Sequence, residues 1–277
     1  MIKYASSIAG CIILILMMVS AGAGIADAEP IVIEGLIEPS LVVNVGSPVP
    51  GILASVKADR GDMVKKGQVL ATLESGVERA TMELTRARAE MEQTIRAGEA
   101  RLDFSIRKQE RFEELYKKKV IPFTDMDEAR TASELALMEL EEARENKRIA
   151  ALEFKRSVAV VNRMSIHSSI AGVVMERFLS PGEHVEDQPV LKLAQIHPLH
   201  VEVFAPVELI GAIKVGMQAD ITPENPAGQK VYKAKVTIVD RVIDAASGTF
   251  GVRLELPNPK YQLPAGLKCR VSFQTSK

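Results

Sequence analysis

The feature that most constrains this chain is a stretch of about 90 residues that almost lacks glycine and proline. Between Gly76 and Gly172 there is one glycine, Gly98, and one proline, Pro122. Because these two residue types mark most turns, their scarcity predicts helix. Only 4% of the chain is aromatic and Trp is absent, whereas large globular cores usually depend on aromatic side chains. The composition therefore predicts long helices with thin cores and argues against one broad globular core.

Residues in this stretch recur with the alternating spacing of four and three that is typical of packed helices. In the second half the positions are Met126, Ala129, Ser133, Ala136, Leu140, Ala143, Lys147, Ala150, Phe154, Ser157, Val161 and Met164. In the first half they are Val77, Ala80, Leu84, Ala87 and Met91, followed after a slip of one residue by Ile95, Gly98, Leu102 and Ile106. The pattern predicts a hairpin over 75–165, with two helices of about 60 Å each at 1.5 Å per residue.

The segments that flank this hairpin resemble each other at an offset of 121 residues. Gly51-Ile52-Leu53 corresponds to Gly172-Val173-Val174, Gly61-Asp62-Met63-Val64 to Gly182-Glu183-His184-Val185, and Val69-Leu70 to Val190-Leu191. We interpret Gly51, Gly61, Gly172 and Gly182 as structural turn positions, where glycine supplies positive φ. Neither copy is large enough to bury its own apolar face. The repeat therefore predicts one sandwich, formed by 45–74 together with 166–194.

The remainder of the chain predicts a small β-barrel made of 29–44 and 195–277. The expected strands are Ile31–Ile37, Leu199–Phe204, Gln218–Thr222, Val231–Asp240, Gly251–Glu255 and Lys268–Phe273, mostly separated by prolines. A short helix is expected at Val207–Ile213. Short strands with one helical link are typical of a barrel. Cys269 alternates with polar residues in its strand and has no His near it in sequence, so we expect a buried hydrophobic residue and no nucleophile.

The N-terminus predicts a targeting segment. Lys3 precedes an uncharged apolar run, and Ala26-Asp27-Ala28 provides small residues for cleavage before Glu29. Residues 1–28 therefore have the pattern of a cleaved secretory signal peptide. An uncleaved anchor is the alternative, because Ala5–Ala26 is about long enough to span a bilayer. The Gly, Ser and Ala residues late in the run favour cleavage.

The order of half-sandwich, long hairpin, half-sandwich and barrel resembles the membrane fusion proteins, the HlyD-like periplasmic adaptors of Gram-negative efflux and secretion systems. The resemblance covers Glu29–Phe273 and identifies the half-motifs with a split lipoyl-like (biotinyl-lipoyl) domain. It implies an elongated, multi-domain α+β fold, a periplasmic location at the inner membrane and no catalysis. It also implies an inner-membrane transporter of the resistance-nodulation-division (RND) or ATP-driven (ABC) type, an outer-membrane channel, and a trimer or hexamer ring on the pump. We expect no membrane-proximal domain, because few residues follow Phe273.

The predicted hairpin tip resembles the segment with which such adaptors contact the channel. The family's motif has Arg, then Leu four residues later, then Ser a further seven residues on. Arg111 and Leu115 fit this motif, and Pro122 stands where the family has Ser. The resemblance therefore assigns the partner contact to Arg111, Leu115 and Pro122.

Two other classes of function compete with this interpretation. A lipoyl or biotinyl carrier needs a modified Lys on the hairpin that joins the half-motifs, but Lys65 and Lys66 lie beside an earlier turn. A metal-handling protein needs three or four clustered ligands, and His197 with His200 is the only close His pair. We therefore expect no cofactor, no metal and no catalytic residue. The net charge of −1 does not favour nucleic acid. The intact mass of the mature chain discriminates a carrier from an adaptor.

Overall fold

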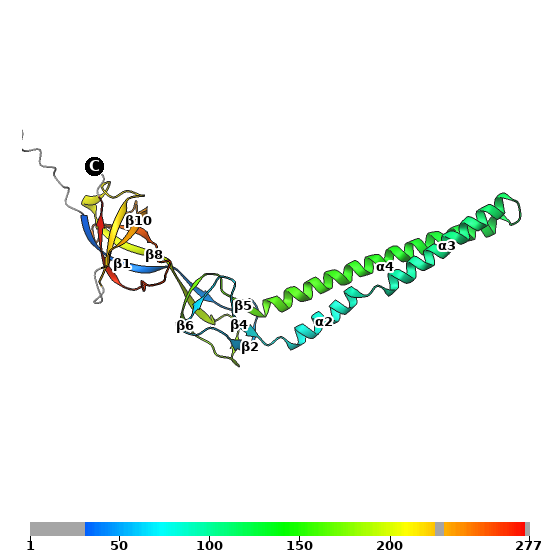
Figure 1. The fold of residues 1–277 in the computed structure, drawn as a ribbon, viewed down its shortest axis with the longest axis horizontal. Helices are drawn as coiled ribbons and strands as arrows, with labels where there is room; N and C mark the ends of the chain where they lie inside the picture. The colour runs from blue at the N-terminus through cyan, green and yellow to red at the C-terminus, as the bar shows by residue number, and fades with distance from the viewer. Residues whose placement is uncertain (1–30, 225–229, 275–277) are drawn as a thin grey trace, which may run out of the picture. The chain divides into compact units, whose positions relative to one another are not determined.

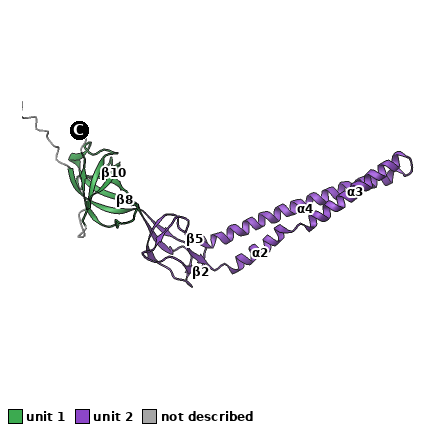
Figure 2. Ribbon diagram, viewed as in Figure 1, with its two compact units in different colours: residues 1–40, 196–277 green, residues 41–195 purple. Residues whose placement is uncertain are grey.

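The computed structural model describes residues 31–224 and 230–274 (Figure 1). The predicted signal peptide lies outside these residues. The chain divides into two compact units, residues 1–40 with 196–277 and residues 41–195 (Figure 2). Within the described ranges, no helix is both long and apolar enough to cross a membrane.

The first unit contains the barrel. Its sheet has the order β1 (Ile31–Val45), β12 (Lys268–Phe273), β9 (Gln218–Pro223), β10 (Tyr232–Val239), β11 (Thr249–Leu256) and β8 (Leu191–Pro206), with β1 also paired to β8. Each strand predicted for this unit is present, and β1 and β8 are longer than expected because both continue into the second unit. The helix predicted at 207–213 is wrong. Only a 3-10 turn, η1 (Val207–Leu209), forms there, and Gly211 at φ +81° follows it.

The barrel is filled by side chains that alternate along its strands. Phe250 and Phe273 are fully buried and are the largest of them. Cys269 is buried in the same core, as predicted from its strand pattern. Burial raises the pKa of the Cys269 thiol to about 11, so the thiol remains protonated and unreactive at neutral pH.

A buried asparagine closes the loop between β11 and β12. The Asn258 side-chain amide donates to the carbonyl oxygens of Ile196 (2.9 Å) and Leu263 (2.8 Å), and its oxygen accepts from the Leu263 N–H (3.2 Å). All hydrogen-bonding groups of this amide therefore find partners within the barrel, as a buried polar side chain requires.

In the second unit, the two half-motifs interlock reciprocally. Their strands are β2 (Gly51–Val56), β3 (Met63–Val64), β4 (Val69–Leu73), β5 (Ser165–His167), β6 (Gly172–Arg177) and β7 (His184–Val185). Strand β2 of the first copy pairs with β7 of the second, and β3 of the first with β6 of the second. The Gly61 N–H donates to the Val174 carbonyl (2.9 Å), and the Gly182 N–H donates to the Leu53 carbonyl (2.7 Å). The paired sandwich that the repeat predicts is therefore present.

The four repeat glycines serve two different purposes. Gly61 and Gly182 occupy turns at φ +92° and +89°. Gly51 and Gly172 do not occupy turns, so our interpretation of these two was wrong: each begins a strand. At Gly172 the reason for glycine is close packing, because a Cβ there would lie 2.0 Å from the Ala194 carbonyl oxygen. At Gly51 the nearest atom to such a Cβ, Leu73 Cδ1, is at 3.4 Å.

The hairpin consists of three helices, α2 (Gly76–Glu90), α3 (Gln93–Lys117) and α4 (Phe123–Arg163). Helices α2 and α3 both lie along α4 (Figure 1). The single first helix of about 40 residues that we predicted is therefore wrong. The chain is extended at Met91, with φ −69° and ψ 125°, where the spacing slips by one residue. Glu92 lies beside this break, where its carboxylate accepts hydrogen bonds from Lys147 of α4 (2.8 Å) and Arg96 of α3 (3.1 Å). These bonds lower the pKa of the Glu92 carboxyl.

The predicted packing positions are confirmed in α4 and are wrong in α2. All the α4 positions of the rhythm are buried or half-buried, with Ala129, Ser133, Ala136, Leu140 and Ser157 the most buried. The α2 positions are wrong, because Val77, Ala80, Leu84, Ala87 and Met91 are all exposed. The residues of α2 that face α4 are Glu78, Met82, Thr85 and Ala89, which are half-buried. A hydrogen bond of 2.7 Å joins the Thr85 and Ser157 hydroxyls and holds α2 in this orientation. In α3, Ile95, Gly98 and Leu102 face α4 as predicted, but Ser105 replaces Ile106.

Candidate partner-contact site at the hairpin tip

The tip is shaped by the way α3 ends. Lys119 adopts φ +57°, and its N–H donates to the Tyr116 carbonyl (2.8 Å). The Val120 N–H donates back to the Leu115 carbonyl (3.0 Å). This pair of bonds is a Schellman motif, which satisfies the last carbonyls of a helix. A lysine holds the left-handed position that glycine usually occupies, so the turn carries strain of about 1–2 kcal/mol.

Three apolar side chains lie exposed around this turn. Val120 and Phe123 are 66% and 55% exposed, and Tyr116 packs edge-on against Phe123 with ring centroids 6.0 Å apart. The residues predicted for the partner contact, Arg111, Leu115 and Pro122, do not include these three. A signal for them was present, because Phe112, Tyr116 and Phe123 place three aromatic residues within one short segment of an aromatic-poor chain.

The three residues predicted for the contact lie near this turn with different exposures. Arg111 is exposed on α3, and the described residues provide no ion pair for its guanidinium. Leu115 is half-buried, and its carbonyl closes the Schellman motif. Pro122 is exposed and directly precedes α4, with φ −70° and ψ 163°. A proline is tolerated there because the first N–H groups of a helix have no intrahelical partner.

The charges around the tip are of both signs, with basic side chains at the end of α3 and Asp125, Asp127 and Glu128 in the first turns of α4. Lys117, Lys118 and Lys119 are exposed at the end of α3, where cations complement the helix dipole. Further back along α3, the Lys108 ammonium lies 5.4 Å from the centre of the Phe112 ring. The tip therefore combines a small apolar surface with cations on its α3 side and carboxylates on its α4 side.

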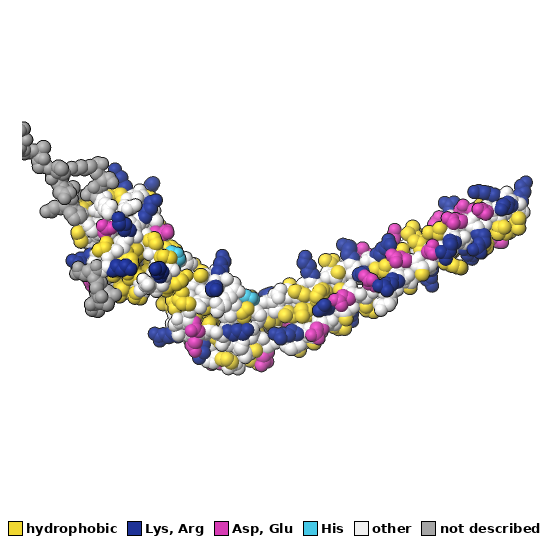
Figure 3. Space-filling view, in the orientation of Figure 1, with side chains coloured by type: hydrophobic (Ala, Val, Ile, Leu, Met, Phe, Trp, Pro, Cys, Tyr) yellow, Lys and Arg dark blue, Asp and Glu magenta, His cyan; other side chains and the backbone are white. Residues whose placement is uncertain are grey.

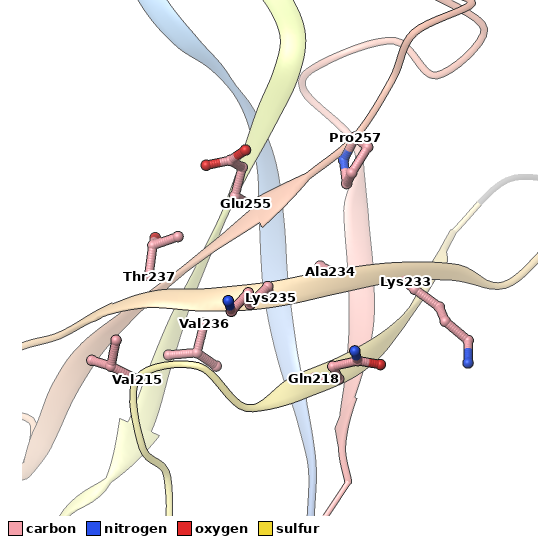
Figure 4. A pocket seen from close by; sticks show the side chains of 9 residues that line it. All are labelled: Val215, Gln218, Lys233, Ala234, Lys235, Val236, Thr237, Glu255 and Pro257. Carbon is pink, nitrogen blue, oxygen red and sulfur yellow. The ribbon is translucent and has the colours of Figure 1, made fainter.

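A hollow on the barrel has a different character. It has a volume of about 650 Å³ and lies on the outer face of β9, β10 and β11, beside Gln218, Lys233, Lys235 and Glu255 (Figure 4). Lys235 and Glu255 are directly opposite each other on neighbouring strands. Every charged or polar side chain that lines the hollow is exposed to solvent. A ligand site normally fixes its polar groups by burial, so the tip remains the stronger candidate.

The residues considered for a carrier or a metal site lie apart from the tip. Lys65 and Lys66 occupy the turn between β3 and β4, where the Lys65 N–H donates to the Gln68 side chain (2.9 Å). In the barrel unit, His197 Nδ1 accepts from the Asn258 N–H (3.0 Å), and its ring lies edge-on to Tyr261. Among the described residues, no group of three or more His, Cys, Asp or Glu is arranged to hold a metal ion.

Comparison with known proteins agrees with this arrangement of domains. The model of the CzcB-like barrel-sandwich hybrid domain matches residues 41–195, and the model of the CusB-like β-barrel domain matches residues 198–277. The first match alone spans more than half of the chain. The chain belongs to the membrane fusion protein family. In this family's terms, the second compact unit is the barrel-sandwich hybrid and its inserted hairpin, and the first is the β-barrel.

Individual relatives agree with this membership. The cation efflux system protein CzcB of Alcaligenes sp. (strain CT14) is 28% identical over 219 residues, which are 78% of this chain and 39% of that protein. The chain thus spans about two fifths of the length of this relative. The crystal structure of MacA from Actinobacillus actinomycetemcomitans has a TM-score of 0.71 at 23% identity, covering 88% of this chain and 78% of MacA. The membrane fusion protein Spr0693 from Streptococcus pneumoniae R6 has a TM-score of 0.61 at 13% identity, covering 89% and 100%. At these identities the two structures support the fold alone.

Proposed function

We propose that this membrane fusion protein is a non-catalytic periplasmic adaptor, which links an inner-membrane transporter to an outer-membrane channel in a tripartite efflux or secretion system. The observation that carries the proposal is the insertion of a long hairpin between the two interlocked halves of the sandwich. Helix α4 alone has 41 residues, or about 60 Å at 1.5 Å per residue. A hairpin of this length can bridge the distance between the transporter and the channel, whereas the barrel and sandwich provide surfaces for docking on the transporter.

The remaining features of the proposal follow from the family and the sequence. The mature chain acts in the periplasm after its signal peptide is cleaved, and assembles on its transporter as a trimer or hexamer. The transporter is of the RND or the ABC type. The name of the CzcB relative, a cation efflux protein, makes cations the first class of cargo to test. Growth of a deletion strain on graded metal salts, with and without the gene restored, tests this class.

At the tip, we propose that Arg111, Leu115 and Pro122 contact the channel. Leu115 lies one helical turn from Arg111, beside the apolar surface of Val120 and Phe123. An apolar groove between channel helices would accept this surface, and a carboxylate or carbonyl at its rim would accept a charge-assisted hydrogen bond from Arg111. The alternative is that Leu115 only closes the tip and Arg111 is solvated.

The charge reversal Arg111→Asp separates these alternatives. We expect efflux to be lost, with normal abundance and an unchanged melting temperature, because a reversed charge in an interface costs several kcal/mol. A solvated arginine tolerates the same change. The matched control is Arg60→Asp in an exposed turn of the sandwich, which we expect to retain efflux. Full efflux by the Arg111→Asp strain would remove the tip contact from the proposal.

A further inference from the structure

Helix α2 lies between two residues with non-helical backbone. Ser75, which precedes it, adopts φ −142° and ψ 29° and provides no side-chain cap for the helix. At the other end the chain is extended at Met91. The helix between them has 15 residues. A helix of this length is marginally stable by itself in water, so α2 depends on its contact with α4.

The packing of α2 against α4 is incomplete. No residue of α2 is buried, and Val77, Leu84 and Met91 are 77%, 54% and 56% exposed. A hollow of about 470 Å³ lies between the two helices, and its lining includes Val77 of α2 with Arg156 and Val160 of α4. On the face drawn in Figure 3, hydrophobic side chains lie among charged ones along the hairpin. Side chains on opposite sides of a hollow do not contact each other, so α2 buries little apolar surface by lying on α4.

The hydrogen bond between the two helices can break without leaving an unsatisfied donor. The Thr85 and Ser157 hydroxyls are 2.7 Å apart. Each also has an acceptor in its own helix, the Thr81 carbonyl for Thr85 (3.0 Å) and the Phe154 carbonyl for Ser157 (2.7 Å). A hydroxyl has a single hydrogen to donate. When the helices separate, each hydroxyl donates to its own helix, so no buried donor is left without a partner to oppose the separation.

Helix α3 is attached to α4 more firmly, and this attachment starts directly after the break at Met91. Buried Leu140 of α4 packs against Gly98 of α3, where an added Cβ would lie 3.2 Å from Leu140 Cδ1. Three ion pairs also join this part of the chain to α4: Glu92–Lys147 (2.8 Å), Glu99–Arg144 (3.3 Å) and Arg101–Glu139 (2.5 Å). Within the described ranges, α2 forms no ion pair with α4, and its pair Arg86–Glu90 lies inside α2.

We propose that α2 is a releasable strap, which leaves α4 as one unit between Ser75 and Met91 while α3 stays packed on α4. Release unwinds α2, because a helix of this length is marginal without its neighbour. Helix α4 is then the only helical connection between the sandwich and the part of the hairpin beyond Met91. The hairpin can therefore bend at its base without losing the contact between α3 and α4. This property goes beyond the proposed function and does not depend on it.

Hydrogen exchange of the purified full chain, followed by mass spectrometry, tests the proposal. The amides of residues 80–90, which lie beyond the first turn of α2, are expected to exchange at least about tenfold faster than those of α3. They are also expected to share one level of protection, because release as a unit exposes them together. Fraying gives a different result, with protection that rises from the ends of α2 toward its middle.

Two buried serines provide a matched pair of variants. Ser157 and Ser105 are 8% and 7% exposed, and each donates to the carbonyl three residues earlier in its own helix. Ser157 also bonds to Thr85 of α2, whereas Ser105 lies on α3 and does not contact α2 by a hydrogen bond in the part of the chain that the structure describes. We expect Ser157→Ala to speed exchange in α2 several-fold and to leave α3 unchanged. Ser105→Ala is expected to leave α2 unchanged.

A reversible disulfide provides the opposite change. Thr85→Cys with Ser157→Cys places two thiols where the hydroxyls lie 2.7 Å apart. The thiol of Cys269 is buried and protonated at neutral pH, so it does not compete. We expect the oxidised double variant to exchange in α2 as slowly as in α3, and reduction of the disulfide to restore fast exchange.

Three results would overturn the proposal. The first is a wild-type α2 that exchanges as slowly as α3. The second is an equal effect of Ser157→Ala and Ser105→Ala on exchange in α2. The third is fast exchange in α2 after the disulfide has formed. The serine pair decides the question by itself if the double variant does not fold.

Discussion

The sandwich and the hairpin are each built from two chain segments, but only the sandwich segments complete each other. In the sandwich, each copy's turn bonds to the other copy's strand, and equivalent residues such as Leu70 and Leu191 are fully buried. In the hairpin, α4 buries its seam, whereas α2 buries nothing and exposes an apolar stripe, here called the α2 stripe, of Val77, Ala80, Leu84, Ala87 and Met91. The sandwich therefore buries its apolar residues within one chain, while the hairpin leaves an apolar stripe exposed.

The contrast between α2 and α4 shows the limit of what the spacing of apolar residues predicts. Apolar residues spaced alternately three and four positions apart lie on one side of a helix. It does not identify the neighbour that covers them. In α4 the neighbour is the other arm, whereas the α2 stripe is exposed. Four predictions test this contrast, from the largest expected effect to the smallest.

The largest effect is expected where the sandwich halves meet. Leu70→Ala and Leu191→Ala remove fully buried side chains at equivalent positions of the two copies. Each is expected to lower the free energy of unfolding by about 2–5 kcal/mol, because truncation leaves a cavity in a shared core. Chemical denaturation of the two variants measures the loss. Reciprocal packing predicts that the two losses agree within about 1 kcal/mol. A large loss at one position and none at the other would break the equivalence.

The seam of α4 is expected to be less sensitive. Leu140 is the largest buried side chain in the hairpin, and it packs against Gly98 of α3, where an added Cβ would lie 3.2 Å from Leu140 Cδ1. Leu140→Ala is expected to cost about 2 kcal/mol, at the lower end for a buried leucine, because a two-helix seam is thin. Hydrogen exchange along α3 and α4 localises the loss. Unchanged protection there would show that the hairpin does not depend on its seam.

The turn glycines test whether the two halves of the sandwich depend equally on positive φ at their turns. Gly61 and Gly182 lie at φ +92° and +89°, and a Cβ added at either position would meet no other atom within 4 Å. Only conformational strain therefore opposes a larger residue. Gly61→Val and Gly182→Val are each expected to cost about 1–3 kcal/mol. Thermal unfolding of both variants measures the effect. Wild-type melting of either variant would contradict the paired-turn interpretation at that position.

Much of the fold was predictable because its signals are local or repeated. The barrel strands followed from alternation and proline, and the sandwich from matched spacing in two copies. The reason for Gly172 was not predictable, because its contact with Ala194 arises only when β6 and β8 pair. The break at Met91 left a trace, the slip of one residue, but this trace does not distinguish a kinked helix from two helices.

The candidate site was predictable only in part. The positions of Arg111 and Leu115 came from a motif, and whether they contact a channel stays a prediction. The left-handed Lys119 and the exposed Val120 were not foreseen, because a Schellman motif without glycine leaves no clear mark in sequence. The orientation of α2 depends on Thr85 and Ser157, two polar residues far apart in the chain. Periodicity of apolar residues does not report such a contact.

The smallest effect on stability is expected at the α2 stripe, where the contrast with the sandwich is sharpest. Leu84 and Leu140 are both helical leucines that follow the same rhythm, but Leu84 is 54% exposed and Leu140 is 2% exposed. Leu84→Ala is therefore expected to change the free energy of unfolding of the isolated protein by no more than about 0.5 kcal/mol. Leu140→Ala has the opposite profile, with a clear loss of stability in the isolated chain. Thermal unfolding of the two variants measures the contrast, and a Leu84→Ala protein that melts several degrees lower would show that its own hairpin covers the stripe.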